Sequence, residues 1–261
     1  MSAVFPFVQL ALDASVDWFA LLSKGVHLES VAKGREGAVL IACAPDGSAP
    51  IVRSTTKYRK PHQQFGYAHT HLTEAVCARM PGLRFNNALI ERYGWQYRSM
   101  GAHSDQAMDL AEDSYICLFS VYNQPGVDTR QLVVTDKETG EKQIFILEHC
   151  TVVFFAVADN ARYRHSIETV SADTGRNECV WLGVTLRCSD TYVRYTDSKA
   201  YFVCDDEELV LLSTKDSARE FYKERSLENK TVFAGKYVYS AVVAHCTISP
   251  SDVMVPLPPC V

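Results

Sequence analysis

Between Phe85 and Arg187 the chain is divided into short apolar runs separated by turn residues, and this pattern constrains the fold more than any other feature. The runs are rich in β-branched and aromatic residues and are shorter than most helices. They are Asn87–Tyr93, Ser114–Tyr122, Gln131–Asp136, Gln143–Leu147, Thr151–Ala158 and Cys179–Arg187, with a hairpin turn expected at Lys137–Glu141. Strands at this spacing predict a sandwich or a double-sheet barrel.

Helical patterns flank this β-rich region. Helices are expected at Asp13–Lys24, with Ser15 as a cap, at His71–Arg79 and at Ser217–Glu228. Further β-like runs are Ala38–Ala44, Tyr192–Tyr195, Ala200–Cys204 and Val232–His245. Because no linker separates the parts, residues 1–261 are expected to form one domain, with N-terminal helices in 1–84, a β core in 85–190 and a C-terminal elaboration in 191–261.

Composition excludes several classes of protein. Apolar residues make up 47% of the 261-residue chain and charged residues 22%, which is typical of a globular domain. The longest apolar run, Val152–Ala158, is far shorter than the roughly 18 residues of a membrane-spanning helix, so no membrane partner is expected. The nine cysteines contain no C-x-x-C pair, which predicts reduced thiols. The first residues lack the basic start of a secretory signal, which predicts a cytoplasmic or nuclear location.

The net charge of −5 argues against a protein that grips a long duplex. One basic cluster is present, and two interpretations of it stay open: a solvated loop, or a short segment that contacts phosphates. It consists of Arg53, Lys57, Arg59 and Lys60.

The chemistry is indicated by His103-Ser104-Asp105 and by His165, sixty residues further on. Residues i and i+2 of a strand project to the same side, so His103 and Asp105 can bind the same metal ion. Two imidazoles and one carboxylate on one face of an iron are typical of non-haem Fe(II) oxygenases. A second group, His69 and His71 with Glu74, could also hold a metal, although a polar helix start is the simpler interpretation.

Several short motifs follow one another in a fixed order between about residues 50 and 190. They are Pro50-Ile51-Val52-Arg53 with Tyr58, Phe85-Asn86-Asn87-Ala88-Leu89-Ile90-Glu91-Arg92-Tyr93, His103-Ser104-Asp105, Ile116–Val121, Arg130-Gln131-Leu132, Ile146–Val153, Asp159–Ile167 and Val184-Thr185-Leu186-Arg187. In the order of these motifs, rather than in any single one, the region resembles the AlkB-like family of Fe(II)/2-oxoglutarate dioxygenases.

This resemblance implies a mainly β fold with flanking helices, a double-stranded β-helix or jelly roll. It implies Fe(II), 2-oxoglutarate and O₂ as cofactors, and oxidative demethylation or hydroxylation of a nucleobase in single-stranded DNA or RNA by a monomeric enzyme. The implied site residues are His103, Asp105 and His165 for iron and catalysis, Tyr93 and Arg187 for 2-oxoglutarate, and Arg53, Tyr58, Phe65 and Tyr67 for substrate, the last four in a lid within residues 1–84.

Two residues depart from the family pattern. Glu91 stands where the family usually has Asn, and Trp181 where it usually has Arg; both family residues help to hold 2-oxoglutarate. An ionised Glu donates no hydrogen bond to a carboxylate, and Trp offers a single N–H. Arg176 could substitute for the missing arginine. Two alternatives therefore stay open: an oxygenase of a protein side chain or small metabolite, and a catalytically inactive binding module.

Overall fold

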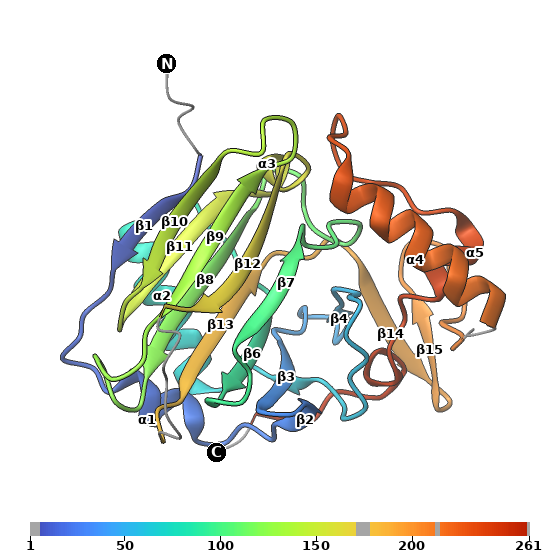
Figure 1. Ribbon diagram of the computed structural model, residues 1–261. Helices are drawn as coiled ribbons and strands as arrows, with labels where there is room; N and C mark the ends of the chain where they lie inside the picture. The colour runs from blue at the N-terminus through green and yellow to red at the C-terminus, as the bar shows by residue number, and fades with distance from the viewer. Residues whose placement is uncertain (1–5, 171–177, 212–214, 260–261) are drawn as a thin grey trace.

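The computed structural model describes residues 6–170, 178–211 and 215–259, and eight consecutive strands form its centre (Figure 1). Each strand is paired antiparallel with its neighbours, in two facing sheets. The eight strands are β6 (Asn87–Tyr93), β7 (Ser99–His103), β8 (Tyr115–Tyr122), β9 (Arg130–Asp136), β10 (Lys142–Leu147), β11 (Thr151–Ala156), β12 (Tyr163–Thr169) and β13 (Trp181–Arg187).

The strand order is that of a jelly roll. One sheet contains the order β11-β8-β13-β6 and the other β10-β9-β12-β7, so the chain crosses between sheets repeatedly as it advances. Strands β1 (Val8–Ala11), β2 (Glu29–Ala32), β3 (Arg35–Ile41) and β5 (Gln63–Gln64) extend the first sheet at its edges. The expected mainly β fold, a double-stranded β-helix with flanking helices, is confirmed.

The central strands of the larger sheet, β8, β11 and β13, are buried on both faces, which explains why they are almost continuously apolar. Its inner face packs against the smaller sheet around Leu118, Leu132 and Phe155. Its outer face is covered by α1 (Trp18–Ser23) and α2 (Tyr67–Arg79), whose Trp18 and Leu72 join the core formed by Phe119 and other outward residues. Seven of the eight residues of β8 are consequently buried.

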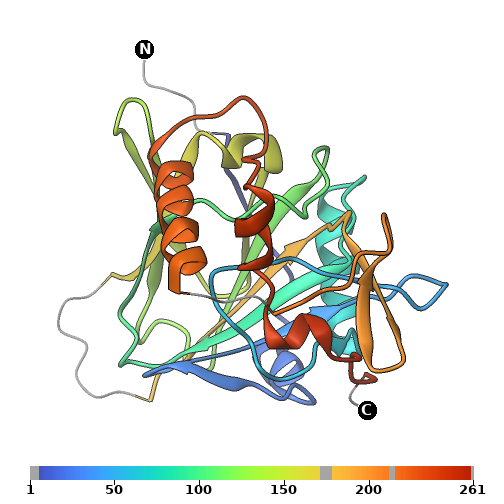
Figure 2. The same cartoon turned by 90° about the vertical axis from the view of Figure 1, so that its right-hand side faces the viewer.

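The C-terminal part lies beside the jelly roll, at the side where β7 ends (Figures 1 and 2). A small sheet pairs β4 (Ala49–Pro50), β14 (Tyr192–Thr196) and β15 (Lys199–Phe202). After β15 the chain forms α4 (Lys215–Lys230), α5 (Ala241–His245) and the 3₁₀ turn η1 (Pro250–Val253). Within the jelly roll itself, the short helix α3 (Val157–Asn160) connects β11 to β12.

Some expected elements differ. The helix expected from Asp13 begins only at Trp18, because Asp17 rather than Ser15 caps it by accepting a hydrogen bond from the Ala20 N–H. The expectation of a β-like run at Val232–His245 is wrong: no strand is assigned there, and α5 occupies its end. Strands β7 and β12 are not evident as separate elements in the sequence pattern, since both carry polar residues from the site described next.

Two expectations from composition can be compared with the described residues. Eight of the nine cysteines lie in this part of the chain, and none of these eight forms a disulfide. Within the same residues, no helix has both the length and the apolar character needed to cross a membrane.

Candidate metal centre

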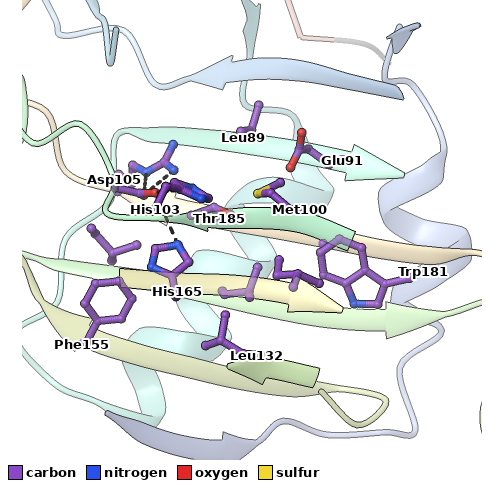
Figure 3. A pocket seen from close by; sticks show the side chains of 15 residues that line it. Leu89, Glu91, Met100, His103, Asp105, Leu132, Phe155, His165, Trp181 and Thr185 are labelled. Atoms are coloured by element: carbon purple, nitrogen blue, oxygen red, sulfur yellow. Dashed lines mark hydrogen bonds and ion pairs between the residues drawn. The ribbon is translucent and has the colours of Figure 1, made fainter. Parts of the chain in front are cut away.

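His103 and His165 are brought together by strand register. β7 and β12 pair antiparallel with His103 directly opposite His165, so both side chains leave the sheet on one face. Their ring centroids are 4.7 Å apart. The Nδ1 of His103 lies 2.8 Å from the Gly101 carbonyl and donates to it, which leaves the Nε2 lone pair free. Figure 3 shows the two rings converging on Asp105.

Asp105 completes a group of three possible metal ligands. Its Oδ1 is 3.6 Å from Nε2 of His103 and 3.6 Å from Nε2 of His165. One ligand atom from each residue lies within 4.8 Å of the others, close enough for a single ion to contact all three after small side-chain movements. Among the described residues this is the only such cluster, so His69, His71 and Glu74 do not form one.

The charge state of the three residues suits a cation. Burial alone would raise the pKa of the Asp105 carboxyl, but Arg187 and the two imidazoles outweigh it and hold that pKa well below its usual range. Burial, reinforced by His103, lowers the pKa of His165 to about 3. At neutral pH the site therefore presents an ionised carboxylate and an unprotonated His165.

Arg187 lies on β13 and is paired with the second oxygen of Asp105. Its Nε and Nη2 donate to Oδ2 at 3.0 and 2.6 Å, which leaves Oδ1 facing the histidines. The structure thus places Arg187 beside the triad, where the sequence predicts a carboxylate-binding arginine. The carboxylate that it contacts here, however, belongs to the protein.

The backbone between the two ligands is held by residues that sequence reasoning did not identify. Asn160 accepts from the Asp105 N–H at 2.9 Å and donates to the Asp105 carbonyl at 2.7 Å. Asn229 of α4 accepts from the Ser104 N–H at 2.9 Å, and Arg225 of α4 donates to the Ser104 carbonyl. Contacts across 55 to 125 residues leave no local pattern in a sequence, so only the fold identifies them.

A cavity extends from the triad into the jelly roll, and its wall is mainly apolar. Figure 3 shows the triad at one end and Trp181 at the other. The lining residues are Leu89, Glu91, Met100, His103, Asp105, Ile116, Leu118, Leu132, Phe155, His165, Ile167, Trp181, Gly183, Thr185 and Arg187. Gly183 is required here, because a Cβ at this position would lie 2.1 Å from the Trp181 ring.

The two departures from the family pattern, Glu91 and Trp181, both line this cavity. The negative charge of Glu91 is balanced by Arg35, whose Nη2 lies 2.5 Å from Oε1 of Glu91. Tyr93 donates to its other oxygen at 2.7 Å. Burial raises the pKa of Tyr93 and the Glu91 carboxylate raises it further, so Tyr93 remains a donor. Arg176 lies outside the described residues.

A second cavity adjoins the triad on its outer side and forms the mouth of the site. It shares Leu89, His103, Asp105 and Arg187 with the inner cavity. Its other lining residues are Val52, Arg53, Ser54, Thr55, Thr56, Gln106 and Arg225. The segment expected to be a lid therefore reaches the site through residues 52–56, and α4 reaches it through Arg225.

The four predicted substrate residues are placed differently from one another. Arg53 lines the mouth, but its guanidinium is paired with Asp109 at 2.6 Å. Tyr58 is buried beside Glu91, with 3.4 Å between hydroxyl and carboxylate. Phe65 packs in the core under the larger sheet, and Tyr67 is 77% exposed and stacks on His71. Phe65 and Tyr67 line neither cavity beside the triad.

The basic cluster is also partly committed to internal contacts. Besides the Arg53–Asp109 pair, the Nζ of Lys57 donates to the carbonyls of Cys246 and Ile248, and burial lowers the pKa of Lys57 to about 8. Lys57, Arg59 and Lys60 are all exposed, and the Nζ of Lys60 donates to the Leu28 carbonyl at 2.9 Å. Arg53 is thus held in a buried ion pair, and both lysine ammonium groups of the cluster are partly occupied by carbonyl oxygens.

Strand order and triad together define the class of the protein: a jelly roll with two histidines and one carboxylate at the open end of its core. No family model and no curated protein matches the chain. Among solved structures, the chain is similar to OsALKBH1, with 13% identity and a TM-score of 0.49 over 72% of this chain and 100% of that one. It is also similar to an oxidoreductase of the 2OG-Fe(II) oxygenase family from Burkholderia pseudomallei, with 16% identity and a TM-score of 0.43 over 69% of this chain and 83% of that one.

Proposed function

We propose that the protein is an Fe(II)- and 2-oxoglutarate-dependent dioxygenase. The observation that carries this proposal is the convergence of His103, Asp105 and His165 at the end of an enclosed cavity. Two imidazoles and one carboxylate suit Fe(II) and leave coordination positions for a cosubstrate and O₂. With both bound, such a centre oxidises a C–H bond of the substrate while 2-oxoglutarate is converted to succinate and CO₂.

The residues fit iron in both donor type and protonation. The Gly101 carbonyl fixes the tautomer of His103, and Arg187 holds one oxygen of Asp105 so that the other faces the histidines. Such hydrogen bonds to the far side of a ligand orient it towards the metal. The apolar side chains of Met100, Leu132 and Phe155 limit the entry of water from the inner side.

The fit to 2-oxoglutarate is good at one end of the cavity and altered at the other. Arg187 is the one basic side chain in the lining and lies beside the triad, where it suits the carboxylate next to the oxo group. Trp181 lies at the far end, and the guanidinium of Arg130 contacts its ring. The Cζ of Arg130 is 5.8 Å from the centroid of the Trp181 ring and 5.0 Å from that of the Tyr93 ring. Its Nη1 has no hydrogen-bond partner among the described residues, so positive charge is present there although Arg is absent from position 181.

For the substrate, we propose a nucleobase in single-stranded nucleic acid, on which the enzyme acts as a demethylase or hydroxylase. The mouth is lined by guanidinium and hydroxyl groups from residues 53–56 and α4, and Asp105 is its single acidic side chain. These groups suit the sugar and phosphate oxygens of a strand. A base reaches an enclosed metal only when it is unpaired or flipped out.

The inactive binding module remains the second candidate, and Glu91 and Trp181 favour it. Neither gives a cosubstrate carboxylate the donors that the family positions supply. The distinction is direct: a module without catalysis forms no succinate.

The experiment is to measure Fe(II)-dependent succinate formation from 2-oxoglutarate with methylated single-stranded oligonucleotides, peptides and small metabolites. We expect succinate above the Fe(II)-free background, most strongly with the oligonucleotides. A preference for a peptide or a metabolite would replace the nucleobase assignment. Absence of succinate under all conditions, with Fe(II) shown to be bound, would establish the binding module instead.

A further inference from the structure

Another cavity lies on the opposite face of the larger sheet from the triad, beneath the chain segment that leads from α1 to β2. Its volume is about 300 Å³, and the two cavities beside the triad measure about 60 and 70 Å³. A volume near 300 Å³ lies at the lower end of the range that is usual for small-molecule sites. This outer cavity is therefore large enough for a small ligand.

The sheet itself separates the outer cavity from the inner one, because successive side chains of a strand point to opposite faces. In β6, Leu89 and Glu91 line the inner cavity, whereas Ile90 and Arg92 line the outer one. In β13, Leu182 lies opposite Arg92 in the strand register and also lines the outer cavity. The outer cavity shares no described residue with either cavity beside the triad, so it is a separate site.

The outer cavity has an apolar floor and a charged rim. Its most buried lining residues are Leu22, Ile90 and Leu182, each at most 1% exposed, and they form the floor. Lys60 and Arg92 line it as well, and both are exposed. Apolar walls with a few polar groups at one side suit an amphipathic ligand, whose carbon body covers the floor while its charged group stays near water.

The charges at the rim leave one cation unbalanced. Among the described residues that line the cavity, Glu36 is the single acid, and it forms an ion pair with Arg92. Lys60 uses one donor of its ammonium group on the Leu28 carbonyl at 2.9 Å. Glu29, outside the lining, accepts from the main-chain N–H of Lys60 at 3.0 Å. With histidine counted as neutral, two cations and one anion give the lining one net positive charge.

We propose that the outer cavity binds a small amphipathic monocarboxylate, with its carboxylate on Lys60 and Arg92 and its apolar body over Ile90 and Leu182. One net positive charge is balanced by a monoanion, whereas a phosphate monoester brings about −1.5 to −2 beside Glu36. A carboxylate accepts charge-assisted hydrogen bonds from an ammonium and from a guanidinium. Glu36 takes the Nε and Nη2 donors of Arg92, which leaves its Nη1 for the ligand.

The test is calorimetric titration of the full-length protein with octanoate, 1-octanol and octyl phosphate, three probes that share one carbon chain. We expect octanoate to bind most tightly. Lys60→Met should weaken octanoate binding by about tenfold or more, because methionine keeps an apolar stem and loses the charged donors. Val26→Trp should abolish binding, because the indole fills the cavity from the half-buried segment above it. The thermal unfolding midpoint of each variant separates lost binding from lost folding.

Lys142→Met, at an exposed position of β10, is the matched control and should leave octanoate binding unchanged. His103→Ala should also leave it unchanged, and a loss of binding in that variant would locate octanoate at the metal and overturn the proposal. Equal affinity for 1-octanol, tighter binding of octyl phosphate, or no binding of octanoate would overturn it as well. The inference does not rest on the proposed function, and no outcome here involves succinate, so the two can fail independently.

Discussion

At the scale of single residues, the site depends on the different contacts of the two carboxylate oxygens of Asp105. Arg187 occupies Oδ2 of Asp105, and Oδ1 faces His103 and His165. A bidentate or stacked arginine fixes a carboxylate more rigidly than lysine can, because its donors form a planar fork. Arg187 therefore orients Asp105 in the structure, and in the proposed function it also binds the cosubstrate carboxylate.

Alanine in place of any one of His103, Asp105 and His165 is expected to abolish Fe(II) binding. Two remaining ligands do not hold the iron as three ligands on one face do. Metal content after equilibrium dialysis measures this directly. His71→Ala is the control, since His71 stacks on Trp18 and Tyr67 away from the triad and should leave the metal content intact. Retention of one Fe(II) by any of the three site variants would exclude the proposed ligand set.

Arg187→Lys is expected to weaken the dependence of succinate formation on 2-oxoglutarate by roughly tenfold or more, since lysine cannot supply the two parallel N–H donors. The measurement is the 2-oxoglutarate concentration at half-maximal rate. Arg162→Lys serves as control, since the Arg162 side chain is 44% exposed and pairs with Asp136 away from the triad. An unchanged half-maximal concentration in Arg187→Lys would show that the anchor lies elsewhere.

At the scale of elements, helices α4 and α2 make contacts that their sequences do not indicate. The expectation of a C-terminal helix at Ser217–Glu228 is confirmed by α4, but nothing in that segment indicates that Arg225 and Asn229 hold Ser104. The contact between His103 and His165 was easier to predict from the sequence. An H-x-D motif at a strand end needs a second histidine from a later strand, and few strand pairings bring the two together. Local pattern predicts which elements form, whereas contacts between distant elements depend on packing that the pattern does not encode.

Asn229→Ala is expected to weaken Fe(II) binding while the jelly roll stays folded, because the Ser104 N–H loses its acceptor and the loop between two metal ligands is released. About tenfold weaker binding is the expected order of magnitude for such a supporting contact. Co(II) substitution provides a second readout, since its visible spectrum reports ligand geometry. Lys223→Ala, which removes an exposed pair with Glu220 on the same helix, should alter neither.

Helix α2 is expected to make stability depend on pH through His69. Burial lowers the pKa of His69 to about 4, and its Nδ1 accepts a hydrogen bond from the Gly66 N–H. The unfolded chain binds this proton near pH 6.5 and the folded chain does not, so stability falls as the pH drops from about 6.5 to about 4, by up to ~3 kcal/mol. His69→Gln keeps an acceptor at the third helical position and should flatten this slope in urea titrations at successive pH values. Parallel slopes for the two proteins would contradict the assignment.

At the scale of the whole molecule, charge is distributed differently from its distribution along the sequence. Arg53, Lys57, Arg59 and Lys60 form one cluster in the chain, but folding directs Arg53 to Asp109 and Lys57 to carbonyl groups near the C-terminal end. A count of basic residues therefore overstates the surface open to a nucleic acid. Sequence alone cannot make this distinction, because the partners lie 56 and 189 residues away.

Arg59 and Lys60 are expected to carry most of the salt dependence of oligonucleotide binding from this cluster, because the Lys57 ammonium is bonded to two carbonyls and Arg53 to Asp109. Replacement of Arg59 and Lys60 together by glutamine should reduce the log–log slope for a single strand by about 1.4, or 0.7 for each phosphate that a basic side chain no longer neutralises. By contrast, Arg53→Gln removes the cation beside the buried Asp109 carboxylate and should destabilise the fold by about 3–5 kcal/mol. Binding measured across salt concentrations, with urea titration in parallel, separates the two effects. Identical slopes before and after the double replacement would show either that the phosphate contacts lie elsewhere on the protein or that the protein does not bind a nucleic acid.

The contacts of α4 with Ser104 also have a consequence for the order of events during synthesis. A ribosome releases the N-terminal part of a chain first, and all eight strands of the jelly roll have been made once Arg187 has been added. Both histidines and Asp105 are then already present, but Arg225 and Asn229 have yet to emerge. Iron loading is therefore expected to be a late step, in which the nascent barrel gains a competent metal centre only after the helix that follows it has docked.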